Sequence, residues 1–427
     1  MQDIFAELSW RGLIHQTTDD ANLQAWLMAQ SRTVYAGFDP TADSLHVGHL
    51  LPLSMLRRFQ RAGHKPIAIV GGATGMIGDP SGKSKERNLL TREQLIANVE
   101  SIEVQMRGVL DFECGQTSAV LVNNFDWMQN FSYLDFLRDV GKNFPVNVML
   151  AKDSVKGRLE KTDAGMSYTE FSYMLLQAYD FVHLSKHHGC ELQIGGSDQW
   201  GNITAGIDLA RRMLSVQLYG LTCPLLTKSD GTKMGKTEAG AIWLSPERTS
   251  PYRFYQYWIN VGDDDVSNCL RVFTDLNQDD VESLDKSRAE EPHKRESQRR
   301  LAEELTKLVH GDSGLQRAQR ATQIFFGQEI DQLSDAELGE IFEDVPSKEL
   351  PRDRLSGDGL GILDAFHESG LASSKGDARR AVQEKGTYLN NARVEDIGRN
   401  LTVDDLISET SLVLRRGKKK YAILRFV

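Results

Sequence analysis

The chain has 427 residues, of which 40% are hydrophobic and 26% are charged, a balance typical of globular proteins and not of disordered or collagen-like chains. This length exceeds what one ordinary core needs, so we expect two or three domains. The formal net charge of −10 argues against nucleic-acid binding by the whole surface.

The first half of the chain alternates strands, polar or glycine turns, and helices. Short amphipathic helices are expected up to Ser31. We predict strands over residues 33–38, 66–70, 118–122 and 190–194, and a helix over 169–181. This order predicts an α/β fold with a Rossmann-like parallel sheet, whose ligands bind at the carboxyl ends of the strands. We assign residues 1–245 to this Rossmann-like domain, with an insertion at about 125–165.

Strand patterns stop after Ser245. Residues 246–345 are predicted to form an α-helical domain, and 346–359, rich in glycine and proline, a linker. Residues 360–427 are predicted to form a small α+β unit with two helices and a final hairpin.

This last unit carries a net charge of +3, whereas the rest of the chain carries −13. A basic module on an acidic body suits a selective RNA contact, although a solvated lysine-rich surface would look the same. The candidate RNA-binding residues are Arg379, Arg380, Arg415, Arg416, Lys418, Lys419 and Lys420.

The cysteines and the apolar runs bear on location and metal content. The four cysteines are scattered with no CxxC pair, which argues against a zinc site or a disulfide scaffold. No apolar run approaches the length of a membrane span, and the first residues do not open a basic signal peptide. We therefore expect a cytoplasmic protein with no membrane segment and no tightly bound metal.

Two short motifs are the most informative features. His46-Val47-Gly48-His49 lies about 185 residues ahead of Lys233-Met234-Gly235-Lys236-Thr237. Neutral imidazoles beside a tight glycine suit the triphosphate of ATP, and mobile lysines can meet the charge that develops when an attacked α-phosphate expels pyrophosphate. The pair predicts nucleotidyl transfer. The histidines could instead be structural or bind a metal, for which a nearby third ligand is missing.

Other residues around these motifs suit a nucleotide. Gly37 ends a strand and lets a ligand lie against bare backbone, and Thr41 adds a hydroxyl. The histidines fall where a helix would offer its first N–H groups to phosphate. Asp198 follows a strand and could accept from ribose hydroxyls, or could cap the next helix.

The glycine-rich segment 75–84 is not a P-loop, because only three residues separate Gly78 from Gly82. It still offers an acid, Asp79, and two cations, Lys83 and Arg87, that could bind anions or form a solvated turn.

Tyr173, Gln177 and Asp180 share one face of a helix whose neighbours are apolar. A phenol, an amide and a carboxylate could hold the ammonium of an amino acid and accept a hydrogen bond from its side-chain hydroxyl. An exposed amphipathic face is the alternative.

Together these segments resemble class I aminoacyl-tRNA synthetases, with HVGH in place of HIGH and KMGKT in place of KMSKS. The closer resemblance is to the bacterial-type tyrosyl-tRNA synthetase family, through YAGFDPT, GGATGMIGDPSGK, YMLLQAYD and QIGGSDQWGNI. The segment SSKGDARRAVQEKGTYLNN resembles an S4-type RNA-binding domain. The resemblance covers nearly the whole chain. It implies that residues 1–245 are the catalytic domain and that the helical domain 246–345 binds tRNA.

The resemblance implies a role for each candidate residue. The phenolic hydroxyl of substrate tyrosine would be bound by Tyr35 and Asp180, and its ammonium by Asp79, Tyr173 and Gln177. Gln199 would lie near the substrate carboxylate, and Gln193 would lie in the pocket wall. The γ-phosphate would be met by Thr41 and His46, and the nucleotide would lie beside Gly37, Asp39 and Gly48. The ribose would be bound by His49 and Asp198. The departing pyrophosphate would be met by Lys83, Arg87, Lys233 and Lys236. Gly235 and Thr237 replace the family's serines, and only Thr237 keeps a hydroxyl.

The implied reaction joins L-tyrosine to ATP, with Mg²⁺, and transfers the tyrosyl group to the 3′ end of tyrosine tRNA. A homodimer is also implied, with the insertion as its interface. Rival interpretations are a small-molecule nucleotidyltransferase, a tryptophanyl-tRNA synthetase, and an RNA-binding scaffold built on an inactive synthetase. The intact histidines and lysines argue against the scaffold, and Tyr35 with Asp180 suits a hydroxyl better than an indole.

Overall fold

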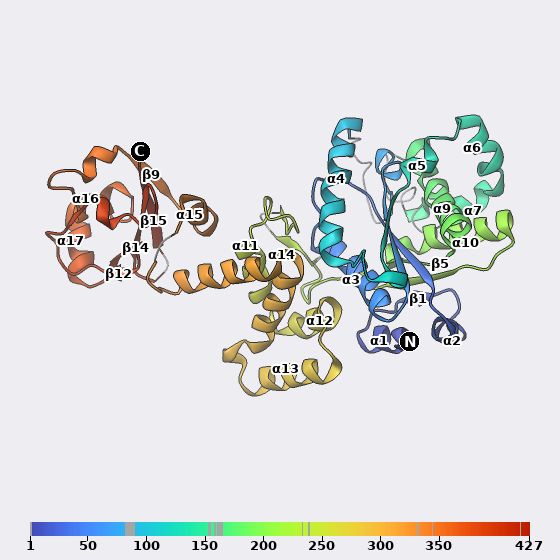
Figure 1. Ribbon diagram of the computed structural model, residues 1–427, viewed down its shortest axis with the longest axis horizontal. Coiled ribbons are helices and arrows are strands. Elements are labelled where there is room, and N and C mark those ends of the chain that lie inside the picture. Colours follow the sequence, from blue (N-terminus) through green and yellow to red (C-terminus); the bar gives the residue numbers. More distant parts are fainter. Residues whose placement is uncertain are drawn as a thin grey trace. The chain divides into compact units, whose positions relative to one another are not determined.

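The computed structural model describes residues 2–81, 90–152, 155–157, 159, 165–232, 234–237, 240–330, 333–343, 345–418 and 420–427, and of Lys236 and Thr237 the backbone alone. Its contacts divide the chain into two compact units (Figure 1). The first comprises Met1–Thr249 and Gln256–Val309, and the second Ser250–Tyr255 and His310–Val427. None of the described helices combines the length and the apolar character that a membrane crossing requires.

A six-stranded sheet forms the centre of the first unit. Its order is β1 (Gln16–Thr17), β6 (Tyr219–Cys223), β5 (Cys190–Gly196), β2 (Thr33–Phe38), β3 (Lys65–Val70) and β4 (Val120–Asn123). Only the pairing of β1 with β6 is antiparallel. The predicted Rossmann-like parallel sheet is therefore confirmed, and the carboxyl ends of β2, β3 and β5 meet at one edge.

Helices cover both faces of this sheet, with α3 and α4 on one side in Figure 1 and α9 and α10 on the other. They are α3 (Val47–Arg61), α4 (Arg92–Val109), α9 (Tyr168–His188) and α10 (Trp200–Leu214), preceded by α1 (Ile4–Trp10) and α2 (Leu23–Ala29). The insertion contributes α5 (Phe125–Met128), α6 (Tyr133–Asp139) and α7 (Val146–Leu150).

Local sequence explains the bounds of α9, the helix that carries the predicted polar stripe. Ser167 caps its start by accepting a hydrogen bond from the backbone N–H of Glu170. Gly189 ends it with φ of +62°, a left-handed conformation that favours glycine. Between these caps, Met174 and Phe181 are buried in the core beneath β2 and β3. Burial of such side chains contributes roughly 1.5–3 kcal/mol each, and it fixes which face of α9 the polar residues occupy.

The helices that follow the sheet are α11 (Pro251–Ile259), α12 (Asp263–Phe273), α13 (Gln278–Glu290) and α14 (Glu296–Phe325). Gly311, with φ of +71°, interrupts the helical geometry of α14, close to where the chain passes from the first unit to the second. The predicted domain 246–345 is thus helical, but its residues are divided between the two units.

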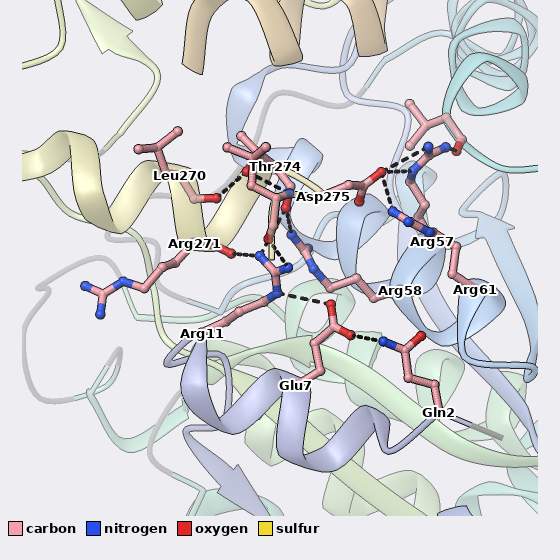
Figure 2. A network of polar contacts seen from close by, with 12 residues as sticks. Gln2, Glu7, Arg11, Arg57, Arg58, Arg61, Leu270, Arg271, Thr274 and Asp275 are labelled. Atoms are coloured by element: carbon pink, nitrogen blue, oxygen red, sulfur yellow. Dashed lines mark hydrogen bonds and ion pairs between the residues drawn. The ribbon is translucent and has the colours of Figure 1, made fainter. Parts of the chain in front are cut away.

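A cluster of arginines joins α1, α3 and the end of α12 (Figure 2). The Arg11 guanidinium donates to the carbonyl oxygens of Arg271 at 2.7 Å, Thr274 at 3.1 Å and Leu276 at 2.7 Å. Arg58 also donates to Thr274, at 2.7 Å. Burial lowers the pKa of Arg58 to about 9. The bonds to Arg271 and Thr274 satisfy carbonyls at the C-terminal end of α12, and the bond to Leu276 holds the segment that follows it.

The same cluster contains an acid. Asp275 forms ion pairs with Arg57 at 3.1 Å and Arg61 at 2.6 Å, both on the last turns of α3. The C-terminal ends of α3 and α12 are therefore held together.

The second unit contains a five-stranded sheet of order β12 (Ala392–Arg393), β11 (Thr387–Leu389), β14 (Ser411–Arg416), β15 (Lys420–Phe426) and β9 (Ser347–Leu350). A two-stranded sheet pairs β10 (Leu360–Gly361) with β13 (Asn400–Leu401). The helices are α15 (Asp335–Ile341), α16 (Ile362–Glu368) and α17 (Lys375–Gln383). The predicted helices and final hairpin of an α+β unit are confirmed.

The segment predicted as a linker, 346–359, is part of this unit instead. β9 pairs in parallel with β15, and Leu350 and Leu355 are buried in the core with Phe426. The first three residues of β9 are exposed, so their polar side chains resemble those of a linker. The backbone of the strand nevertheless pairs with β15 at the edge of the sheet.

Residues that precede β9 in the chain also pack into the C-terminal unit. The Asn391 amide donates to the carbonyls of Ile324 and Gln328, each at 2.8 Å. Ile324 and Phe342 pack with Tyr421 in a second core cluster. The C-terminal unit therefore includes the end of α14.

Candidate active site

A cavity of about 710 Å³ opens at the carboxyl edge of the parallel sheet. Fourteen predicted residues line it: Tyr35, Gly37, Asp39, Thr41, His46, Gly48, His49, Asp79, Tyr173, Gln177, Asp180, Gln193, Asp198 and Gln199. Lys83, Arg87 and Lys233 lie outside the described residues, as do the side chains of Lys236 and Thr237. The structure thus gathers into one cavity residues that are up to 164 positions apart.

Asp180 is a buried carboxylate in the cavity wall, 3% exposed. Its two oxygens accept hydrogen bonds from the amide of Asn124 at 3.0 Å and from the indole Nε1 of Trp127 at 2.9 Å. Burial raises the pKa of Asp180 to about 7, although both hydrogen bonds act to lower it. Neither Asn124 nor Trp127 is among the residues predicted from sequence; the only signal was the position of Asn124 just after a predicted strand.

Three buried polar atoms of the cavity have no hydrogen-bond partner among the described residues: the hydroxyl of Tyr35 and the amide oxygens of Gln177 and Gln193. Burial also raises the pKa of Tyr35 well above the usual value, so the phenol is neutral. A buried polar group without a partner costs about 1–3 kcal/mol. A ligand with its own hydroxyl and amine groups would supply the missing partners.

Two further carboxylates line the cavity. Asp39 accepts from the hydroxyl of Tyr173 at 2.9 Å and from that of Thr74 at 2.7 Å. Asp79 accepts from the amide of Gln199 at 2.7 Å. A ligand ammonium would find its countercharge here. The phenol of Tyr173 is already engaged with Asp39, so its link to an ammonium would run partly through that carboxylate.

The HVGH motif forms the start of α3. Nδ1 of His46 accepts from the backbone N–H of Gly48 at 3.0 Å, and Nδ1 of His49 accepts from the N–H of His46 at 3.2 Å. The two rings stack with centroids 3.9 Å apart. A Cβ on Gly48 would lie 2.8 Å from the His46 ring, so this arrangement requires glycine. Because each Nδ1 accepts, each neutral ring carries its proton on Nε2, where it can donate.

The second motif docks on the same helix. Gly235 has φ of +81°, and a Cβ there would lie 2.8 Å from Cβ of Val47. The N–H of Ile242 donates to the carbonyl of Gly235 at 2.9 Å, and the N–H of Val47 donates to that of Ile242 at 3.0 Å. Glycine in place of the family serine is thus explained by backbone geometry and close contact. Beside it, β7 (Lys236–Thr237) pairs with β8 (Gly240–Ala241).

Asp198 lies in the turn directly after β5, at the cavity. A Cβ on Gly196 would lie 2.6 Å from its carboxylate oxygen, so the acid lies close over bare backbone. No group of three or more His, Cys, Asp or Glu side chains in the described ranges is arranged to hold a metal ion.

The candidate RNA-binding residues fall into different settings in the second unit. Arg379 and Arg380 on α17 are exposed, as are Lys418 and Lys420 at the hairpin, and Lys419 lies outside the described residues. Arg416 forms a bidentate ion pair with Asp377, at 2.8 and 2.9 Å.

Arg415 requires a correction. It is 8% exposed, and its guanidinium lies 3.7 Å from the ring centroid of Tyr388. Because it points into the unit and not to solvent, Arg415 does not fit the predicted contact with RNA.

The fold is a Rossmann-like parallel sheet, and the cavity at its carboxyl edge is lined by the HVGH motif and by Met234 and Gly235 of the second motif. Residues 28–327 match the family described as tRNA synthetases class I (W and Y), and residues 337–424 match the tyrosine–tRNA ligase SYY-like C-terminal domain. The chain belongs to this class I tRNA synthetase family.

Curated relatives and solved structures agree with this membership. The tyrosine–tRNA ligase of Rhodopirellula baltica is 61% identical over 99% of this chain and 96% of its own length. That of Roseiflexus castenholzii is 55% identical over the whole of both chains. Among solved structures, a C-terminally truncated mitochondrial tyrosyl-tRNA synthetase of Aspergillus nidulans is 32% identical, with a TM-score of 0.68, over 76% of this chain and 95% of that one.

Proposed function

We propose that this chain activates L-tyrosine with ATP and then esterifies it to the 3′ end of tyrosine tRNA. The observation that carries the proposal is the unpaired hydroxyl of Tyr35 in the same cavity as the carboxylate of Asp180. Two curated relatives at 61% and 55% identity are named tyrosine–tRNA ligases, which supports the same activity.

Tyrosine recognition follows from the polar groups of the cavity. Asp180 accepts a hydrogen bond from the substrate hydroxyl, and Tyr35 supplies a second partner. The ammonium is held by Asp79, Gln177 and the Tyr173–Asp39 pair. Gln193 and Gln199 complete the wall, Gln199 near the carboxylate. Rejection of phenylalanine arises because its missing hydroxyl would leave these buried groups unpaired, a form of discrimination for which tyrosyl-tRNA synthetases are a standard example.

Activation is an in-line displacement at phosphorus. A carboxylate oxygen of tyrosine forms a bond to the α-phosphorus of ATP, the bond to the bridging oxygen breaks, and pyrophosphate leaves with the electron pair. Nε2 of His46 and the hydroxyl of Thr41 meet the phosphates, with Gly37, Gly48 and Asp39 close to the nucleotide. The first N–H groups of α3 do not serve the phosphates as the sequence suggested, because those of Val47, Gly48 and His49 already donate to Ile242 and His46. His49 and Asp198 hold the ribose.

The remaining charge is met by cations. Mg²⁺ accompanies ATP as part of the substrate and neutralises its phosphates. Lys83, Arg87, Lys233 and Lys236 meet the leaving pyrophosphate, and the hydroxyl of Thr237 takes the place of a family serine. In the second step a terminal ribose hydroxyl of the tRNA attacks the tyrosyl carbonyl, and AMP leaves.

Residues 360–427, which carry a net charge of +3 and are similar to an S4-type domain, bind the tRNA through Arg379, Arg380, Arg416, Lys418, Lys419 and Lys420. The enzyme acts in the cytoplasm.

A homodimer is supported by apolar side chains on the insertion and the start of α9. They are exposed by 44–74%: Tyr133, Leu134, Val146, Val148, Leu150, Leu159 and Tyr168. Several exposed apolar side chains on one segment of a globular protein suit an interface. Replacing Leu134 with aspartate should shift the mass measured by light scattering from dimer to monomer, whereas an unchanged mass would exclude this surface.

The test of the activity is ATP–pyrophosphate exchange with each of the twenty amino acids, followed by charging of tyrosine tRNA. Exchange with tyrosine alone is expected. Exchange with tryptophan in its place, or no exchange with any amino acid, would overturn the proposal.

A further inference from the structure

The loop that carries the second motif is tied to the two helices that follow it. The backbone N–H of Gly235 donates to the hydroxyl of Tyr257, on α11, at 2.8 Å. That hydroxyl in turn donates to Sδ of Met234, at 3.1 Å. At the other end of the loop, the N–H of Ser229 donates to Asp265, in the first turn of α12, at 2.8 Å. All five residues belong to the first unit.

The tyrosine is well placed for this contact. Its neighbour Trp258 is fully buried and packs edge-on against Phe273 at a centroid distance of 5.2 Å, so this part of α11 is fixed. Burial raises the pKa of Tyr257 to about 12. The neutral phenol can therefore accept from a backbone N–H and donate its own proton at the same time.

The two helices are themselves anchored to the helix of the first motif. The C-terminal end of α12 is bonded to Arg11 and Arg58 and ion-paired to the last turns of α3 (Figure 2). α3 begins at His46. The loop is thus held against the start of α3 directly, by Gly235 on Val47, and indirectly, through the helices that bear Tyr257 and Asp265.

Gly235 is the point where these contacts meet. Its carbonyl accepts from Ile242, its N–H binds Tyr257, and its α-carbon packs on Val47. Without the tyrosine hydroxyl, the N–H would lose a partner that holds the loop in this one arrangement. A neutral hydrogen bond of this kind changes an equilibrium by about two- to tenfold.

We propose that Tyr257 is a positioning residue for amino-acid activation: its hydroxyl is a latch that ties the loop of the second motif to α11 and so keeps Gly235 against Val47 of α3, with Asp265 as a second anchor. This inference rests on the proposed function. The latch acts on the loop and not on the tyrosine pocket, so it should affect the rate of activation and not the binding of tyrosine.

The test compares Tyr257→Phe with the unaltered full-length protein in ATP–pyrophosphate exchange. The kcat is expected to fall about two- to tenfold, while the KM for tyrosine stays within about twofold. Tyr219→Phe is the matched control, because it removes a phenol hydroxyl from the start of β6, on a ring that contacts Trp26 and not the loop residues Met234 or Gly235. An unchanged kcat in Tyr257→Phe, or a tyrosine KM that rises as much as kcat falls, would overturn the latch.

The second anchor has its own matched pair. Asp265→Ala should lower kcat in the same way, whereas Asp264→Ala, an exposed acid on the same turn, should not. If both anchors act on one loop, the double variant Tyr257→Phe with Asp265→Ala should lose less than the product of the single losses. Fully independent losses would contradict a shared loop.

Amide hydrogen exchange gives a readout that needs no activity. In the protein without substrates, the segment around Gly235 should exchange faster in Tyr257→Phe than in Tyr219→Phe, and equal exchange would overturn the latch. The two hypotheses also fail differently. If the unaltered protein shows no tyrosine-dependent ATP–pyrophosphate exchange, the proposed function is wrong. If the unaltered protein is active and Tyr257→Phe does not change its kcat, only the latch is wrong.

Discussion

The indole Nε1 of Trp127 donates to Oδ1 of Asp180 at 2.9 Å, across 53 positions of sequence. Asn124 donates to the other oxygen, so both oxygens of the carboxylate are held by fixed donors. Such donors orient an acceptor before a ligand arrives, which reduces the cost of organising the site on binding. Asp180 is therefore a preset acceptor for a ligand hydroxyl.

Replacing Asp180 with alanine should compress the tyrosine-over-phenylalanine ratio of kcat/KM by at least about tenfold, because the acceptor for the hydroxyl is lost. The ratio is measured by ATP–pyrophosphate exchange with each amino acid. Asp126→Ala, on the exposed side of α5, is the control and should leave the ratio intact. A ratio preserved in Asp180→Ala would remove this residue from hydroxyl recognition.

Discrimination should also depend on pH, because burial raises the pKa of Asp180 to about 7. Above this pH the ionised carboxylate is a stronger acceptor for a phenol and a costlier neighbour for phenylalanine. The tyrosine-over-phenylalanine ratio should therefore rise between about pH 6 and pH 8. Trp127→Phe removes a donor that lowers the pKa, so the inflection should move upward. A flat profile would contradict the raised pKa.

The same raised pKa sets a sign for stability. Between about pH 4 and pH 7 the folded protein keeps a proton on Asp180 that the unfolded chain has released, so the contribution of this group to the unfolding free energy falls as pH rises through that window. Asp180→Asn should flatten that part of the stability profile, measured without substrates by urea unfolding at several pH values. An unaltered slope would show that other groups dominate it.

Arg11 should be important for stability although it lies outside the cavity. Arg11→Lys keeps the charge but cannot reach three carbonyls in a fixed fork, so we expect a loss of about 2–4 kcal/mol in unfolding free energy. Urea unfolding followed by tryptophan fluorescence measures it. Arg107→Lys, at an exposed position of α4, provides the comparison; an equal loss in both would mean that the carbonyl contacts contribute little.

The sheet and the polar stripe of α9 could be predicted from sequence, because each rests on a local pattern. Residues 33–38 form β2 as expected, since a hydrophobic run there ends at a turn. Tyr173, Gln177 and Asp180 all reach the cavity because helical spacing places them on one face and apolar neighbours fix that face.

Other features depend on contacts that no local pattern encodes. Trp127 reaches Asp180 only because the insertion folds back on α9. β9 has three exposed residues and one buried leucine, although it pairs with β15. Its sequence therefore lacks the alternation of apolar and polar residues by which a strand is predicted. Arg415 belongs to a strand whose first five residues are all buried, so no alternation marks its side chain, and a basic run at a hairpin suggests solvent. Its burial depends on the ring of Tyr388 from a neighbouring strand.

The position of β9 predicts where the C-terminal unit can be cut. A fragment of residues 310–427 should fold, whereas residues 360–427 should not, because the shorter fragment loses β9 and uncovers Val413, Tyr421 and Ile423. Each uncovered side chain forfeits roughly 1.5–3 kcal/mol. Circular dichroism should show a cooperative thermal transition for the longer fragment alone. A cooperative transition in the shorter one would restore 346–359 as a linker.

Binding of tRNA should separate the exposed arginines of α17 from the buried one of β14. Arg379→Ala with Arg380→Ala should weaken the affinity for tyrosine tRNA and reduce the salt slope of binding by about one for each phosphate that is no longer neutralised, with no change in thermal stability.

Arg415→Ala should instead lower the unfolding free energy of the C-terminal unit by about 1–3 kcal/mol, since it removes a desolvated cation from the ring of Tyr388. Its salt slope, measured at a temperature where the unit is folded, should equal that of the unaltered protein. A reduced slope in Arg415→Ala would return this arginine to the RNA surface, because a residue that acts only by packing neutralises no phosphate.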